Sequence, residues 1–216
     1  MASNRSSLTV GGTAIPDERM YPVFLEPVGL AVAGPVVWTD PRPTVDVAFP
    51  SRSGGVPVDD TFPVTLDGVG ALRPGLDLQR AADATGQTII VHEWNEASLG
   101  CGHAFIDDVN LTLYLEAPVG DGEPSADEAV IVAIEAGLGF ETDTGLAWFD
   151  SAENLAAAYP PETLSIVANE YGDERHVRHL PTPDADRALF FPLGEVGVHT
   201  IVTGYADSVV RAEGFA

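Results

Sequence analysis

Short runs in which apolar and polar residues alternate, separated by proline and glycine, make up most of the sequence after residue 20. The clearest run is VNLTLYLEA (109–117), which places Val109, Leu111, Leu113 and Leu115 on one side and mainly polar residues on the other. Apolar residues at every second position are typical of a β-strand that buries one face. The pattern therefore predicts a protein built mainly of strands.

Other runs of the same character predict further strands. We expect them within residues 21–38, 44–49, 62–68, 87–94, 128–136, 145–149 and 163–171, and roughly two or three more within 187–212. Three prolines restrict the first of these runs to short or edge strands, because proline cannot donate a ladder hydrogen bond.

Helical signals are confined to two segments. Residues 74–86 predict a short helix with Asp77 as its N-cap and Gly86 as its stop. Residues 150–162 predict a second helix, which begins at Asp150 or Ser151 as N-cap and ends at a Pro-Pro pair.

About eight to ten short strands with only two minor helices favour an all-β fold over alternating βαβ units. We expect a single jelly-roll or β-sandwich-type barrel with two short helices. Residues 1–20 are polar and contain glycine, and are predicted to form an N-terminal arm, with residues 21–216 as one β-barrel or sandwich domain. The loop 117–128 is the best internal boundary, but a long inter-strand loop explains it equally well.

Charge sets the solvent in which we expect the protein to work. The chain contains 33 Asp and Glu and only 10 basic residues, all of them arginine, which gives a formal net charge of −23. So much like charge opposes the compact state in dilute solution, whereas at about 1 M salt the Debye length falls to about 3 Å and the repulsion is screened. The composition is similar to that of proteins from salt-in halophiles, haloarchaea above all.

The same charge argues against nucleic acid as a direct partner, because phosphate binding needs a basic face. The small Arg/His cluster in 173–187 is interleaved with acidic residues and gives no basic stripe. We expect no transmembrane helix, since no uninterrupted apolar run approaches about 18 residues. The N-terminus has no pattern of a signal peptide.

Chemistry-bearing residues gather in HEWNEASLGCGH (92–103). His92, Cys101 and His103 are the candidate metal ligands, which Glu93 or Asp107 could complete. Cys101 and His103 are two residues apart, so on a strand their side chains point to the same face. No established metal motif is present, and a polar loop between two strands explains the stretch as well.

The sequence raises two other kinds of site. Cys101 with His103 as its base is a candidate thiol nucleophile, although a lone cysteine is more often a small buried apolar residue. A cupin-type metal site needs a close His-x-His, which the sequence lacks, since His176 and His179 are three apart beside arginines. We therefore expect no catalytic residues and no bound cofactor.

Two classes of function remain: an assembly protein, and a jelly-roll enzyme or binding module with a metal. The arm favours assembly, since such arms commonly reach a neighbouring subunit. Five aromatic residues predict apolar patches between subunits, unless they fill the protein's own core. They are Trp38, Phe49, Phe62, Phe190 and Phe191.

The acidic lysine-free composition, the density of strands and the arm MASNRSSLTVGGTAIPDERMYPVFLEP resemble the single β-barrel (jelly-roll) capsid proteins of haloarchaeal icosahedral viruses. This resemblance implies a structural virion protein that packs with copies of itself and with other virion proteins. It also implies assembly in the cytoplasm of a halophilic host. Tail-tube and connector proteins of haloarchaeal tailed viruses are similar in composition, so the role within the virion stays open.

Overall fold

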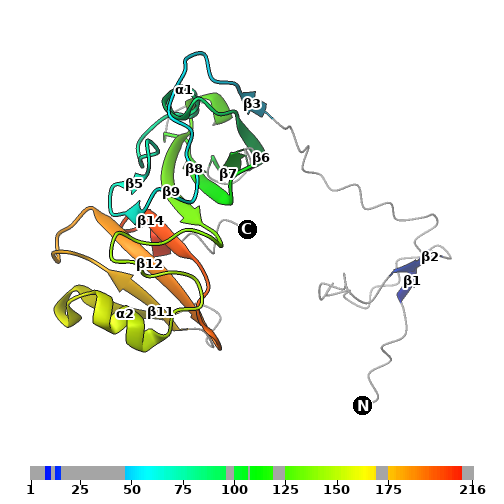
Figure 1. Ribbon diagram of the computed structural model, residues 1–216. Coiled ribbons are helices and arrows are strands. Elements are labelled where there is room, and N and C mark those ends of the chain that lie inside the picture. The colour runs from blue at the N-terminus through cyan, green and yellow to red at the C-terminus, as the bar shows by residue number, and fades with distance from the viewer. Residues whose placement is uncertain are drawn as a thin grey trace. The chain divides into compact units, whose positions relative to one another are not determined.

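The computed structural model describes residues 8–10, 13–15, 47–95, 100–106, 108–118, 125–168 and 175–210 (Figure 1). The chain forms two compact units, Met1–Pro43 and Thr44–Ala216. In the first unit, strands β1 (Leu8–Val10) and β2 (Thr13–Ile15) pair antiparallel with each other. The expected end of the arm at residue 20 and the predicted strand in 21–38 lie outside the described residues.

The second unit is built on a sheet that contains ten of the described strands. In spatial order these are β3 (Val47–Phe49), β6 (Ile89–Asn95), β7 (Cys101–Ile106), β8 (Leu111–Glu116), β9 (Val130–Ala136), β14 (Ile201–Tyr205), β12 (Arg187–Gly194), β11 (Arg175–His179) and β10 (Leu164–Ala168), with β13 (Gly197–Val198) beside β12. The strand pairs in this sheet are antiparallel. A separate small pair joins β4 (Val64–Thr65) to β5 (Gly68–Val69).

Two meanders make up the large sheet. Strands β6, β7, β8 and β9 pair in that order, and so do β10, β11, β12 and β14. The two meanders, green and orange in Figure 1, meet where β9 pairs with β14. The prediction of an all-β fold with two short helices is confirmed. Within the described residues β3 and β10 are the two edges and do not pair, so closure into a barrel stays a prediction.

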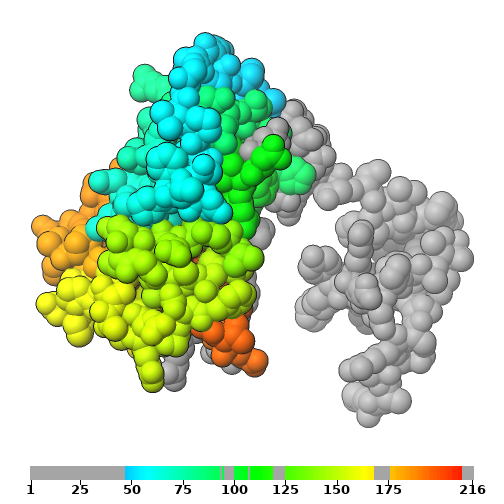
Figure 2. Space-filling view, in the orientation of Figure 1, coloured from blue at the N-terminus to red at the C-terminus, as the bar shows by residue number. Residues whose placement is uncertain are grey.

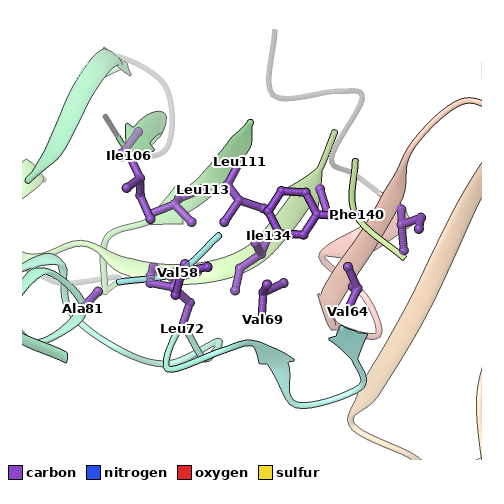
Figure 3. Packing of buried hydrophobic residues seen from close by; sticks show 14 of the residues in the cluster. Val58, Val64, Val69, Leu72, Ala81, Ile106, Leu111, Leu113, Ile134 and Phe140 are labelled. Atoms are coloured by element: carbon purple, nitrogen blue, oxygen red, sulfur yellow. The ribbon is translucent and has the colours of Figure 1, made fainter. Parts of the chain in front are cut away.

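The main core lies between one face of the sheet and the chain segments that cover it. Leu113 and Ile134 of the sheet are fully buried, and Figure 3 shows them facing Val58, Val69 and Leu72 of the covering segment. Residues 50–75 and 137–160 occupy adjoining parts of this side of the surface (Figure 2), and the backbone N–H of Val64 donates to the carbonyl of Glu141 between them. Removing each large side chain from water contributes about 1.5–3 kcal/mol, so this layer supplies much of the stability.

The opposite face of the sheet buries a smaller cluster that includes Val132, Val202 and Val209. Phe190 and Phe191 follow each other in β12 and are both buried, one in each cluster. Phe49 is buried in the main core as well, and Phe62 packs against it. For these four residues the alternative of core filling is therefore correct and that of patches between subunits is wrong, while Trp38 lies outside the described residues.

Both helices begin and end where the sequence predicts. Helix α1 (Leu78–Thr85) starts after Asp77, whose carboxylate accepts from the N–H of Arg80 at 2.8 Å, and it stops at Gly86 with φ +72°. Helix α2 (Ala152–Ala158) starts after Ser151, whose hydroxyl accepts from the N–H of Asn154 at 3.2 Å. No helix in the described part of the chain has the length and apolar character to cross a membrane.

The strand predictions differ from the structure at several places. Strand β7 lies in a stretch for which no strand was predicted, and the run 62–68 holds β4 and the start of β5 instead of one strand. The predicted strand 145–149 is a turn, in which Gly145 and Phe149 both have positive φ. Strand β11 was not expected, because its sequence RHVRH offers a single aliphatic side chain. That residue, Val177, is partly buried against the main core, and His176 and His179 of the same strand are buried as well.

Candidate functional site

The three candidate metal ligands lie on the β6–β7 hairpin. In β7, Cys101 and His103 are half-buried and alternate with the buried Gly102 and Ala104, so the two share the more open face of the strand, as predicted. The pairing of the hairpin shifts between Val91 and Glu93, the point at which β6 carries His92. A β-bulge of this kind redirects side chains.

Ring contacts fix the two histidines on this face. The ring of His92 meets Phe105 edge-on at 6.0 Å between centroids, and the ring of His103 meets Tyr114 edge-on at 5.0 Å. Phe105 is two residues from His103 and shares its face. Thus the structure brings His92, Cys101 and His103 to one side of the hairpin.

These side chains do not form a metal centre with other described residues. No group of three or more His, Cys, Asp or Glu among the described side chains is placed to hold a metal ion. The two carboxylates expected to complete the site, the side chain of Glu93 and residue Asp107, lie outside what the structure describes. The metal site at His92, Cys101 and His103 therefore stays a prediction.

A row of polar groups continues from the hairpin into the sheet. His103 pairs with Tyr114 across β7 and β8, and the Tyr114 hydroxyl donates to the carboxylate of Glu135 on β9. Tyr114 is buried and Glu135 is half-buried, so this bond lies in a partly water-excluded region where it is strengthened. The row orients Tyr114, since a carboxylate accepts its only proton.

Sequence reasoning assigned Tyr114 to the polar side of its strand but did not find Glu135. The two residues are separated by a long loop, and their meeting depends on the register of β8 against β9, which includes an irregularity after Tyr114. A local sequence pattern carries no information about that register.

A second buried polar cluster lies beside α2. The ring of Tyr159, the residue that ends this helix, stacks on His179 of β11 at 4.3 Å between centroids. The hydroxyl of Thr163 donates to the carbonyl of Pro160 at 2.7 Å and lies 2.9 Å from Nδ1 of His179. Because that hydroxyl has already given its proton, Nδ1 of His179 is the donor, and the neutral ring carries its proton there.

Burial governs the acid–base behaviour of this pair. It lowers the pKa of His179 from its ordinary value of 6.5, against the opposing charge of Asp143. It also raises the pKa of the Tyr159 phenol, which the hydroxyls of Thr142 and Thr144 partly offset. Both groups are therefore held neutral around pH 7, which suits packing more than proton transfer.

Three exposed apolar side chains lie in turns at one end of the sheet. Leu138 follows β9, Phe149 lies in the turn before α2, and Val196 lies between β12 and β13; they are 60%, 56% and 62% exposed. Hydrogen bonds bring the three turns together. The indole of Trp148 donates to the carbonyl of Ala136 at 3.3 Å, and the N–H of Phe149 to that of Val198 at 2.8 Å. We call Leu138, Phe149 and Val196 the end patch.

The end patch contains a strained residue. Phe149 has φ +66°, and among the described non-glycine residues only Asp108 shares a positive φ. The turn is held by the Asp150 carboxylate, which accepts from the N–H of Ala147 at 2.8 Å and from the amide of Asn154 at 2.7 Å. These two bonds also lower the pKa of Asp150, with that from Ala147 the larger cause.

The sequence pattern did not predict the end patch, because residues 145–149 were predicted to form a strand. Comparison with protein-family models, with curated proteins and with solved structures finds no match to this chain.

Proposed function

We propose that the protein is a structural subunit of the virion of a halophilic virus, a capsid subunit that assembles with copies of itself at high salt. The observation that carries the proposal is the end patch, and above all the exposed ring of Phe149 on a left-handed backbone. On this proposal its partners are its own copies and other virion proteins, and it works in the particle after assembly in the host cytoplasm.

Phe149 is costly for the isolated subunit in two ways. A left-handed conformation costs a residue other than glycine about 1–2 kcal/mol. Phe149 is also 56% exposed, so more than half of this apolar residue stays in water and contributes no burial free energy to folding. Strain held by the surrounding structure is concentrated at functional positions, and neighbouring exposed apolar groups mark interaction surfaces.

The charge of the chain explains why such an interface needs salt. Two copies that each carry a formal charge of −23 repel each other in dilute solution. At about 1 M salt and above, screening over about 3 Å removes most of that repulsion, and the apolar contact then dominates. The proposal therefore predicts assemblies that form in concentrated salt and dissociate in dilute salt.

The test compares the full chain in roughly 3 M and roughly 0.1 M salt by light scattering and negative-stain imaging, concentrations that bracket the screening regimes. We expect regular assemblies only at high salt, and their loss in Phe149→Asp. The matched control is Val56→Asp, which changes a valine that is 62% exposed and whose N–H donates to Ala84 of helix α1, outside the end patch. Circular dichroism of each variant shows that the fold is retained.

Two outcomes would overturn the proposal. The first is an assembly that is indifferent to salt or to Phe149→Asp. The second is a monomer at both salt concentrations. If that monomer also carries one metal ion that is lost when His92, Cys101 or His103 is replaced by alanine, the jelly-roll metal-binding enzyme becomes the better reading.

A further inference from the structure

The β10 edge of the large sheet lacks the features that usually protect an edge strand. Among the described residues β10 pairs only with β11, and that pairing runs over five residues without a bulge. Its sequence, LSIVA, contains no charged residue and no proline. Natural edges are commonly blunted by charges, prolines, bulges or short length, because open backbone groups invite another strand.

The opposite edge differs. Strand β3 is three residues long and is followed at once by Pro50. A short strand that ends at a proline offers little backbone for pairing. The two edges are therefore unequal, and β10 is the one suited to accept a strand.

Ile166 is the most exposed of the large apolar side chains that the structure describes. It pairs with Val177 of β11, which pairs in turn with Phe191 of β12, so the three lie in one row on the face of the main core. Along this row Phe191 is fully buried, Val177 partly buried and Ile166 74% exposed. The apolar row thus reaches the edge of the sheet and ends in water.

The sequence of this edge is compatible with a second copy as its partner. Strands β10 and β11 contain two arginines and no acidic residue, whereas Glu162 precedes β10 and three acidic residues lie between the two strands. Two copies are therefore expected to pair here at salt concentrations that screen those carboxylates. A partner strand from the same chain also has the right sequence, because LSIVA is centred on its own isoleucine.

We infer that two copies of this chain pair β10 with β10 in antiparallel fashion about a twofold axis at Ile166, so that their sheets become continuous. This arrangement places Ile166 opposite Ile166 of the second copy and Leu164 opposite Ala168, all apolar, while Ser165 meets Val167. A twofold axis uses the same surface on both subunits, and added strands bind through main-chain hydrogen bonds. The inference builds on the proposed function, since the dimer would be the unit from which the assembly grows.

The first test is the mass of the full chain by analytical ultracentrifugation in roughly 3 M salt, the screened regime, in a Phe149→Asp background that prevents larger assembly. Ile166→Asp and the exposed-valine control Val56→Asp are each added to this background. Loss of one buried apolar anchor typically weakens an interface by about 30-fold. Because Ile166 occurs twice at the axis, we expect the dissociation constant of Ile166→Asp to rise on the order of 10³-fold. Val56→Asp should remain dimeric. Equal masses for the two variants would overturn the inference.

The second test fixes the register with cysteines, in a chain whose single cysteine, Cys101, is replaced by serine. Opposed residues of an antiparallel pair have Cα atoms about 4.5–5.5 Å apart, which a disulfide spans. Ile166→Cys should therefore form a covalent dimer under mild oxidation. Ser165→Cys is the control, because its two copies lie on a diagonal at about 7–8 Å and should cross-link poorly. Equal cross-linking of the two variants would contradict the register.

The two proposals fail separately. Large assemblies that contain no Ile166→Cys cross-link would overturn this inference and leave the proposed function standing. A cross-linked dimer that forms no larger assembly, even when Phe149 is intact, would support the inference and overturn the proposed function.

Discussion

Phe149 offers a comparison in which glycine should stabilise the protein more than alanine does. Phe149→Ala keeps a Cβ atom at φ +66°, whereas Phe149→Gly removes it. The left-handed conformation costs alanine about 1–2 kcal/mol, and glycine loses about 0.4–1 kcal/mol through the greater freedom of the unfolded chain. The difference leaves Phe149→Gly more stable than Phe149→Ala by about 1 kcal/mol.

The assay is urea unfolding followed by circular dichroism, at high salt and at a protein concentration that keeps the chain monomeric. Val196 is the control position, since it is equally exposed and its φ is not positive. There alanine should be the more stable variant, by about 0.4–1 kcal/mol. An alanine variant at 149 that equals or exceeds the glycine variant would refute the argument from strain. Both substitutions at 149 should abolish assembly, because both remove the exposed ring. Only the glycine variant also relieves the backbone strain, so the two effects can be measured separately.

Three further outcomes are expected. Tyr114→Phe removes the hydroxyl that donates to the half-buried Glu135 carboxylate, and should cost about 1 kcal/mol in urea unfolding, with Glu135→Gln adding little in that background. Phe140→Ala opens a cavity at a residue that is 1% exposed, and should lower the free energy of unfolding by about 3–5 kcal/mol in the same assay. Burial lowers the pKa of His179, so the unfolded chain binds more protons and stability is lost as pH falls from about 6.5 through the folded-state pKa. His179→Gln should flatten that loss in melting temperatures between about pH 5 and pH 8.

The parts of the fold that were predictable depend on neighbours in sequence. The alternation in 109–117 assigned Leu111, Leu113 and Leu115 to the core, and all three are buried. The ends of α1 follow from a carboxylate at Asp77 and a glycine at Gly86, because a capping bond and a left-handed stop are local chemistry.

The parts that were missed depend on contacts between distant segments. Strand β11 is held by its neighbours on both sides and buries His176 and His179 beside a partly buried valine, so its own residues give no strand signal. The run that ends at Phe149 has the pattern of a strand, and the hydrogen bonds with β13 that hold it as a turn come from a distant segment of the chain. The bond between Tyr114 and Glu135 likewise requires a strand register that local patterns do not encode.

The seam between β9 and β14 also sets an order for folding. Each meander consists of hairpin contacts that are local in sequence and form early, whereas Ala136 pairs with Ile201 only after the second meander has been made. During synthesis the β9 edge, with its mainly apolar sequence VIVAIEA, therefore stays unpaired until β14, the last of the described strands, has emerged from the ribosome. In that interval the nascent chain exposes an open strand, which makes this seam the point where aggregation competes with folding.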